Sequence, residues 1–419
     1  MDNYCNFIKY YKEPQYNYNV VTSSFFIIHN SYKKIDIYFN GLKNIVTNFK
    51  KIFDKNWYLR IYIDDSLDAS KNHNMKNILL KYSGFIDELF HLDFVQMVKF
   101  SCDMFKNKNN SPYHYGLFGT LMRYYPLFDF NDNLHIKYSI VLDIDISVKE
   151  LQFNYEMFNT IKKFNEKHPE IKPILFSSLT TLYYIKYKPR MITDDWIDGG
   201  RIRNMNYKFP KQIILSFFDL LLNNNSNIYE YMKKVSSNKL KHHDKLDYIY
   251  QYGIDEYFLN VYLEPYLKEN KITYASEIIL MPSKLIYSHY VYNKKYKELS
   301  KEKEENIKKM FKILLEDKYN DSLNVTDNFN ILDKIIYSIK SRKIEREMEK
   351  VFALRTAKFL NLVKNDYEQY GFNKKLLKLF SLYAKSNGKP FILIHNSTTG
   401  NKKLMKILPY SFYQEKRII

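Results

Sequence analysis

Short apolar runs alternate with amphipathic segments along the first 293 residues, and this alternation most constrains the fold. Val20–His29 and Trp57–Ile63 are rich in β-branched and aromatic residues, as strands are. Between them, Ile35–Phe53 repeats apolar residues at helical spacing. The pattern continues to strand-like runs at Tyr138–Val148 and Pro173–Ser178. Strands separated by helices favour an α/β fold with a largely parallel sheet.

The composition changes after about Asn293. The segments that follow are charged and helical in spacing until Lys389–Asn396, KPFILIHN, which again reads as a strand. We therefore predict an α/β domain over residues 1–293, a helical insert or cap over 294–388, and a strand and tail over 389–419 that return to the first domain.

The net charge is +19. One interpretation is a partner that carries phosphate, such as nucleic acid, a nucleotide or anionic lipid. The other, which we favour, is the Lys- and Asn-rich coding of an AT-rich genome, because the lysines are interspersed with acids and aromatics. Nucleic acid is therefore not an expected partner.

The sequence shows neither a secretion signal nor an apolar run long enough to span a bilayer. Two cysteines, Cys5 and Cys102, cannot make a disulfide framework, which favours a reducing compartment. The chain is expected to be soluble and cytoplasmic, without a transmembrane segment.

The strongest candidate for chemistry is the segment Tyr138–Glu150, YSIVLDIDISVKE. Asp143 and Asp145 flank Ile144 at the end of an apolar strand, and alternation along a strand points both carboxylates the same way. Like charges repel, and a divalent cation such as Mn²⁺ or Mg²⁺ prefers carboxylate oxygens. The pattern predicts a metal site at the ligand-binding edge of the sheet. The alternative is an edge strand with solvent-facing polar residues.

A predicted helix over Tyr113–Tyr125 precedes this strand. At 100° per residue, one narrow stripe of the helix holds Gly116, Gly119, Thr120 and Arg123. Small residues let another group approach closely, and Arg123 is suited to pair with an anion. The alternative is a surface helix with a solvated arginine.

Three blocks in this order resemble the GT-A glycosyltransferases, and most closely glycosyltransferase family 8. They are LMRYYPLFDF followed by YSIVLDIDISV, the segment IDGGRI at 197–202, and GIDEYFLN at 253–260. The composition is also similar to that of such enzymes encoded by giant DNA viruses. The resemblance covers residues 20–293 and implies a Rossmann-like mixed, mainly parallel sheet with a C-terminal helical region.

The resemblance also implies roles for single residues. Asp143 and Asp145, with Ile144 between them, would hold Mn²⁺ or Mg²⁺ against the donor diphosphate. Asp255 and Glu256 would lie beside the reacting sugar carbon as catalytic residues, together with Asp198. The remaining contacts to the donor would come from Val21, Thr22, Ser23, Asp64, Arg123, Gly199, Gly200, Gly400 and Lys402. Asp198 replaces the family's asparagine, and Ile-Asp-Glu replaces its Asp-Gln-Asp.

The family uses a histidine as a third metal ligand, and two candidates compete here. His395 ends a strand and is followed by Gly400 and Lys402, which suit a diphosphate, so it is preferred. His289 in LIYSHYVYNKKY is the alternate.

The function expected from these features is metal-dependent transfer of a sugar from a UDP-sugar, or a related nucleotide sugar, to a hydroxyl of a glycan or protein. Family 8 implies retention of configuration. The alternatives are a basic nucleic-acid-binding protein and an inactive glycosyltransferase fold in a structural role.

Overall fold

The computed structural model describes residues 4–28, 34–106, 112–169, 174–180, 201–223, 228–229, 249–250, 253–279, 300–302, 391–395 and 402–405. The chain divides into two compact units. The first comprises Met1–Ser177, Ile197–Ala275 and His395–Asn401, and the second the remaining segments. Apart from residues 300–302, the predicted insert 294–388 lies outside the described residues, so that boundary stays a prediction.

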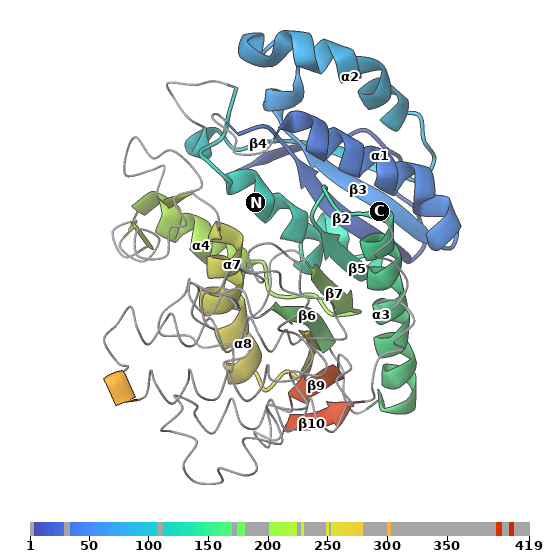
Figure 1. Ribbon diagram of the computed structural model, residues 1–419, viewed down its shortest axis with the longest axis vertical. Helices are drawn as coiled ribbons and strands as arrows, with labels where there is room; N and C mark the ends of the chain where they lie inside the picture. Colours follow the sequence, from blue (N-terminus) through green and yellow to red (C-terminus); the bar gives the residue numbers. More distant parts are fainter. Residues whose placement is uncertain are drawn as a thin grey trace, which may run out of the picture. The chain divides into compact units, whose positions relative to one another are not determined.

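The first unit is built on a mixed sheet with the strand order β1-β4-β3-β2-β5-β7-β6. The four strands β4, β3, β2 and β5 are mutually parallel, whereas β1 and β7 run antiparallel to β4 and β5. This arrangement confirms the predicted α/β class and its Rossmann-like, mixed sheet (Figure 1). The strands are β1 (Asn6–Lys9), β2 (Tyr18–Phe25), β3 (Trp57–Ile63), β4 (Val95–Ser101), β5 (Ile136–Leu142), β6 (Ile174–Thr180) and β7 (Arg201–Met205).

Helices cover both faces of the parallel strands. On β2, the Phe25 ring contacts Phe39 of α1 (Ile35–Ile52), whereas the Thr22 hydroxyl bonds to the 3₁₀ helix Phe118–Leu127. Residues an odd number apart on a strand point to opposite faces, so these two helices lie on opposite sides of the sheet. α1 packs beside α3 (Val148–Lys167). Among the described residues, further α-helices are α2 (Lys76–Leu89), α4 (Gln212–Asn223), α7 (Ile254–Phe258) and α8 (Glu264–Glu269).

Two predicted elements differ from those observed. β5 ends at Leu142, and Asp143–Asp145 form a turn before α3, so the strand predicted to Val148 is six residues too long. The helix predicted over Tyr113–Tyr125 is a 3₁₀ helix over Phe118–Leu127 that contains Pro126. Pro126 has no N–H to donate, which removes one backbone hydrogen bond near the end of this helix.

Cys5 and Cys102 form a disulfide that joins the segment before β1 to the residue after β4. One bond is not a framework, but it removes the reason for inferring a reducing compartment from the cysteine count. It also ties the antiparallel edge strand β1 to the parallel part of the sheet.

The second unit contains most of β9 (Phe391–His395) and all of β10 (Lys402–Met405), which are hydrogen-bonded neighbours. β8 (Tyr274–Ile279) begins in the first unit and ends in the second. Within the described part of the chain, helices long and apolar enough to cross a bilayer are absent.

Candidate active site at the carboxyl end of strand β5

The four parallel strands end at one edge of the sheet, and acidic residues directly follow two of them. Asp64 follows β3 and Asp143 follows β5, whereas the disulfide-bonded Cys102 follows β4. In open α/β sheets this edge is where ligands bind. The side chains at this edge are therefore the first candidates for a ligand-binding site.

The turn after β5 presents two carboxylates. Asp143 is 51% exposed at its side chain, Ile144 is buried, and Asp145 is half-buried. The buried Ile144 anchors the turn and leaves both acids outside the core. The two acids thus lie in a turn rather than in a strand, so the strand alternation that predicted their common direction does not apply, and their pairing stays a prediction.

Helix α1 braces the turn through Gly41. A Cβ on Gly41 would lie 2.4 Å from the Ile144 carbonyl oxygen and 2.6 Å from the Asp145 Cα. A glycine is required at this point because the helix backbone approaches the backbone of the turn too closely for a side chain.

Arg123 reaches the turn from the 3₁₀ helix on the opposite face of the sheet. Its Nη1 donates to Asp143 Oδ1, and its Nη2 donates to Asp255 Oδ2 at 2.5 Å. Burial by itself would lower the pKa of Arg123, but Tyr124 and the carboxylates of Asp143 and Asp255 outweigh it and raise the pKa. One buried cation therefore holds two carboxylates that are 112 residues apart in the chain (255 − 143).

Asp255 comes from α7, which follows Gly253 at a φ of 98°, in the left-handed region where glycine is favoured. Its side chain is 12% exposed, and its Oδ1 accepts a hydrogen bond from the Glu256 N–H at 2.9 Å. The Tyr124 hydroxyl lies 3.2 Å from Arg123 Nη2 and 3.4 Å from Asp255 Oδ2. Glu256 is buried. The arrangement fixes the Asp255 carboxylate beside the turn after β5.

The predicted donor residues on β2 lie inside the sheet. Val21, Thr22 and Ser23 are all buried. The Thr22 hydroxyl donates to the Arg123 carbonyl oxygen at 3.1 Å, so it positions the helix that carries the arginine. Their predicted contact with a nucleotide stays a prediction.

The small residues of the predicted stripe are packed by the chain itself. A Cβ on Gly119 would lie 2.6 Å from the Phe26 ring. Gly116 has a φ of 42°, and a Cβ there would lie 2.2 Å from the Tyr250 carbonyl oxygen. The close approach expected at this stripe is thus an internal contact at these two positions.

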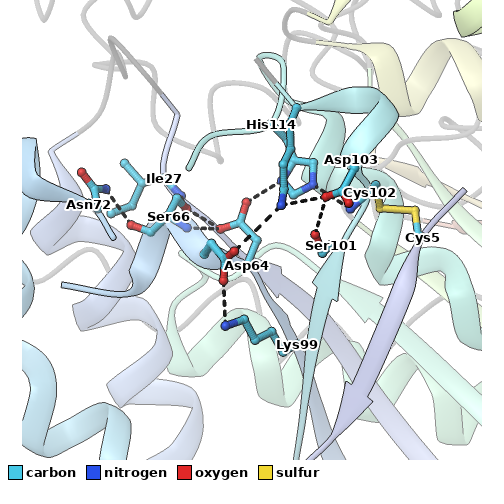
Figure 2. A network of polar contacts seen from close by, with 12 residues as sticks. Cys5, Ile27, Asp64, Ser66, Asn72, Lys99, Ser101, Cys102, Asp103 and His114 are labelled. Atoms are coloured by element: carbon cyan, nitrogen blue, oxygen red, sulfur yellow. Dashed lines mark hydrogen bonds and ion pairs between the residues drawn. A yellow bond between two sulfur atoms is a disulfide. The ribbon is translucent and has the colours of Figure 1, made fainter. Parts of the chain in front are cut away.

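Asp64 lies in a buried network that no local sequence pattern indicates (Figure 2). Its Oδ1 accepts from the Ser66 N–H at 3.0 Å and from the Ser66 hydroxyl, and its Oδ2 lies 2.8 Å from His114 Nδ1. Both carboxylate oxygens are thus used within the chain, and the predicted contact with a uracil ring stays a prediction. A His following a strand-end Asp by 50 residues gives no local signal, because only the fold brings the two together.

The neighbouring Asp65 is surrounded by lysines. Its carboxylate lies 2.7 Å from Lys99, 2.9 Å from Lys71 and 3.9 Å from Lys106. Burial by itself would raise the pKa of Asp65, but the hydrogen bonds from Lys99 and Lys71 outweigh it and lower the pKa. These lysines are therefore already partly neutralised.

The structure does not describe the side chains of several residues that were predicted to belong to this site. Asp198, Gly199, Gly200, His289 and Gly400 lie outside the described residues. His395 is the last residue of β9 and Lys402 the first of β10, and only the strands are described at these two positions. Within the described ranges, clusters of three or more His, Cys, Asp or Glu that could hold a metal ion are absent.

The carboxylate oxygens of the turn are nevertheless suitable ligands for a hard cation. Asp143 and Asp145 offer carboxylate oxygens, which Mg²⁺ and Mn²⁺ prefer, and such ions commonly complete their shell with water and substrate phosphates. Two accessible carboxylates on one turn therefore fit a metal that is bound together with a phosphorylated substrate.

Searches of protein families, curated proteins and solved structures for similar chains found no match.

Proposed function

We propose that this protein is a metal-dependent glycosyltransferase that moves a sugar from a UDP-sugar, or a related nucleotide sugar, to a hydroxyl acceptor. The observation that carries the proposal is the contact of Arg123 with both Asp143 and Asp255. The family 8 resemblance assigned Arg123 and Asp143 to the donor and Asp255 to the reacting sugar carbon, from two separate blocks of sequence. Their convergence at the ligand edge of a Rossmann-like sheet supports that assignment.

The metal would be held by Asp143 and Asp145, and when bound it would act as a Lewis acid on the departing diphosphate. Arg123 contributes a fixed positive charge at the same turn, where negative charge develops on the leaving group. Because its Nη1 is bonded to Asp143, the arginine also sets the orientation of that carboxylate.

Asp255 is the carboxylate best placed to act on the sugar side. Arg123 and the Glu256 N–H hold it in one orientation. In a retaining reaction, which family 8 implies, it would position the donor or stabilise a cationic sugar. In an inverting reaction it would accept the proton of the acceptor hydroxyl.

The proposal extends to partners and location. The donor is a nucleotide sugar and the acceptor a glycan or protein hydroxyl, with no nucleic acid expected. The proposed location remains the cytoplasm, although the cysteines no longer argue for it, since they are paired.

A thermal-shift panel of nucleotides and sugar nucleotides, each with and without Mn²⁺, tests the proposal. A ligand that binds the folded chain raises its unfolding temperature according to its concentration and affinity. We expect UDP and at least one UDP-sugar to raise the midpoint only when Mn²⁺ is present. Slow Mn²⁺-dependent hydrolysis of the same UDP-sugar should accompany the shift.

Variants without the carboxylate charge test whether the Mn²⁺-dependent shift arises at the turn after β5. Asp143→Asn and Asp145→Asn should abolish the Mn²⁺-dependent shift while the free variants still unfold cooperatively. Asp87→Asn, at an exposed position on α2, is the matched control and should behave as wild type. The proposal is wrong if no nucleotide binds under any condition, or if the shift survives in both turn variants.

A further inference from the structure

A continuous polar network joins the disulfide to the loops that follow β3 and β2 (Figure 2). The Cys102 N–H donates to His114 Nε2 at 3.1 Å, and His114 Nδ1 lies 2.8 Å from Asp64 Oδ2. Asp64 accepts from Ser66, whose hydroxyl oxygen accepts from the Ile27 N–H at 2.7 Å. The network thus crosses the carboxyl ends of three neighbouring parallel strands.

The hydrogen bonds of the network select one tautomer of the histidine ring. A ring nitrogen that accepts from a backbone N–H carries no proton, so Nε2 is bare and the proton lies on Nδ1. Nδ1 then donates to Asp64. The side chains are 1% exposed for His114 and 0% for Asp64, so neither can exchange these partners for water. The Cys102 N–H therefore holds the His114 ring, and the ring in turn holds the Asp64 carboxylate.

The disulfide is anchored beside a short edge strand of the sheet. β1 spans only Asn6–Lys9, and in the described sheet it is an edge strand that pairs with β4 alone. Cys5 directly precedes it and is 4% exposed, whereas Cys102 is fully buried. Edge strands of this length open readily, so Cys5 becomes reachable by local opening without unfolding of the core.

We propose that the Cys5–Cys102 disulfide is a redox-controlled strap whose reduction releases β1 and, through His114 and Asp64, loosens the loops after β3 and β2. Cys102 then loses its covalent anchor, and its N–H no longer meets His114 in a fixed position. The inference does not depend on the proposed sugar transfer.

The reductant is a dithiol of the thioredoxin type. One of its thiolates attacks Cys5 Sγ, the sulfur–sulfur bond breaks, and Cys102 leaves as a thiolate that takes up a proton. The second thiol of the reductant then attacks the mixed disulfide and releases Cys5 as a thiol. Two cysteines are reduced, and the dithiol is oxidised to its own disulfide.

Amide hydrogen exchange on the full chain, oxidised and reduced with dithiothreitol, tests the proposal. In the reduced chain we expect exchange at least tenfold faster in β1 and at the amides of Cys102, Ser66 and Ile27. The reduced chain should keep the helical circular dichroism of the oxidised chain, which shows that the fold survives although reduction lowers its global stability.

Two sets of variants separate the strap from the network. Cys5→Ala with Cys102→Ala should show the reduced pattern and no response to dithiothreitol. His114→Gln and Ser66→Ala, kept oxidised, should speed exchange at Ile27 while β1 stays protected. The two single substitutions break the network at different points, so the test remains available if one of them does not fold.

Four outcomes would overturn the inference. One is that reduction speeds exchange in β1 but leaves exchange at Ser66 and Ile27 unchanged. The disulfide would then stabilise β1 alone and have no influence on the loops after β3 and β2. The others are loss of the helical circular dichroism on reduction, free thiols in the untreated protein, and a disulfide that dithiothreitol cannot reduce in the folded chain.

Discussion

At the scale of single residues, Arg123 carries most of the electrostatic balance of the candidate site. Its side chain is 5% exposed, and it neutralises the nearly buried Asp255 together with the more exposed Asp143. An unpaired charge at 12% exposure is costly because little water reaches it, whereas a half-exposed carboxylate is solvated. The two pairs are thus unequal, and the one to Asp255 dominates.

Arg123→Met should lower the free energy of unfolding by about 3–5 kcal/mol, because it leaves Asp255 buried without a counter-charge. Adding Asp255→Asn should recover part of that loss, whereas adding Asp143→Asn should recover less. Urea unfolding of the single and double variants measures these differences. Equal recovery by both second substitutions would contradict the unequal pairing.

Lys208 offers a second residue-scale test. It is half-buried, and its Nζ donates to the Pro126 carbonyl oxygen at 2.6 Å. Burial lowers the pKa of Lys208 to about 7, with a smaller contribution from Arg60. Between this value and the ordinary pKa of lysine, the unfolded chain binds a proton that the folded chain does not. Folding therefore carries a penalty that is complete below pH 7 and falls as the pH rises.

Lys208→Met should remove that penalty. The variant should therefore gain more stability over wild type at pH 6 than at pH 9. The difference between the two gains in the free energy of unfolding should be about 2–3 kcal/mol. Loss of the hydrogen bond to Pro126 subtracts about 1 kcal/mol at every pH. Urea unfolding at both pH values measures the difference, with the exposed Lys211→Met as control. A difference independent of pH would contradict the lowered pKa.

At the scale of elements, the turn after β5 is fixed from both sides. α1 contacts its backbone at Gly41, and α3 begins directly after it with a capping box between Ser147 and Glu150. The Ser147 hydroxyl accepts from the Glu150 N–H at 3.2 Å, and the Glu150 carboxylate accepts from the Ser147 N–H at 2.9 Å. Neighbouring helices thus determine where Asp143 and Asp145 lie.

Two helical glycines give a matched pair of substitutions. Gly41→Ala should destabilise the chain by about 1–3 kcal/mol, because the new methyl group meets backbone atoms that cannot move aside. Gly84→Ala on α2, where a Cβ would meet nothing within 4 Å, should stabilise it by about 1 kcal/mol. Thermal unfolding of both variants checks the signs. Gly41→Ala should also weaken Mn²⁺ binding, which the electron paramagnetic resonance signal of free Mn²⁺ measures.

At the scale of the molecule, the disulfide closes a loop between residues 97 positions apart that contains β1 to β4. A loop of this length restricts the unfolded chain strongly. Cys5→Ala with Cys102→Ala should therefore lower the free energy of unfolding by about 4–5 kcal/mol in the chain-entropy description. Equilibrium urea unfolding without reductant measures it. Unchanged stability would show that the unfolded chain is already compact in this region.

Local pattern predicted the central elements well. β3 was predicted over the residues observed, and α1 was predicted to within one residue at its end. β1 and β7, with four and five residues, were missed because neither is long enough to show alternation. The capping box before α3 is a readable signal that was overlooked. Short blocks of sequence suggested Arg123, Asp143 and Asp255 as site residues, which stays a prediction, and gave no sign that the three contact one another.

The sequence by itself determined the α/β class, the order of the central strands and helices along the chain, and the acidic pair after β5, because periodicity and composition act over a few neighbouring residues. Only the tertiary structure decided that Arg123 binds Asp143 and Asp255 together, that Asp64 pairs with His114, and that Cys5 meets Cys102. These contacts join residues 20 to 132 positions apart in the chain. Packing of the sheet and its helices brings such residues together, and no local pattern encodes their distances.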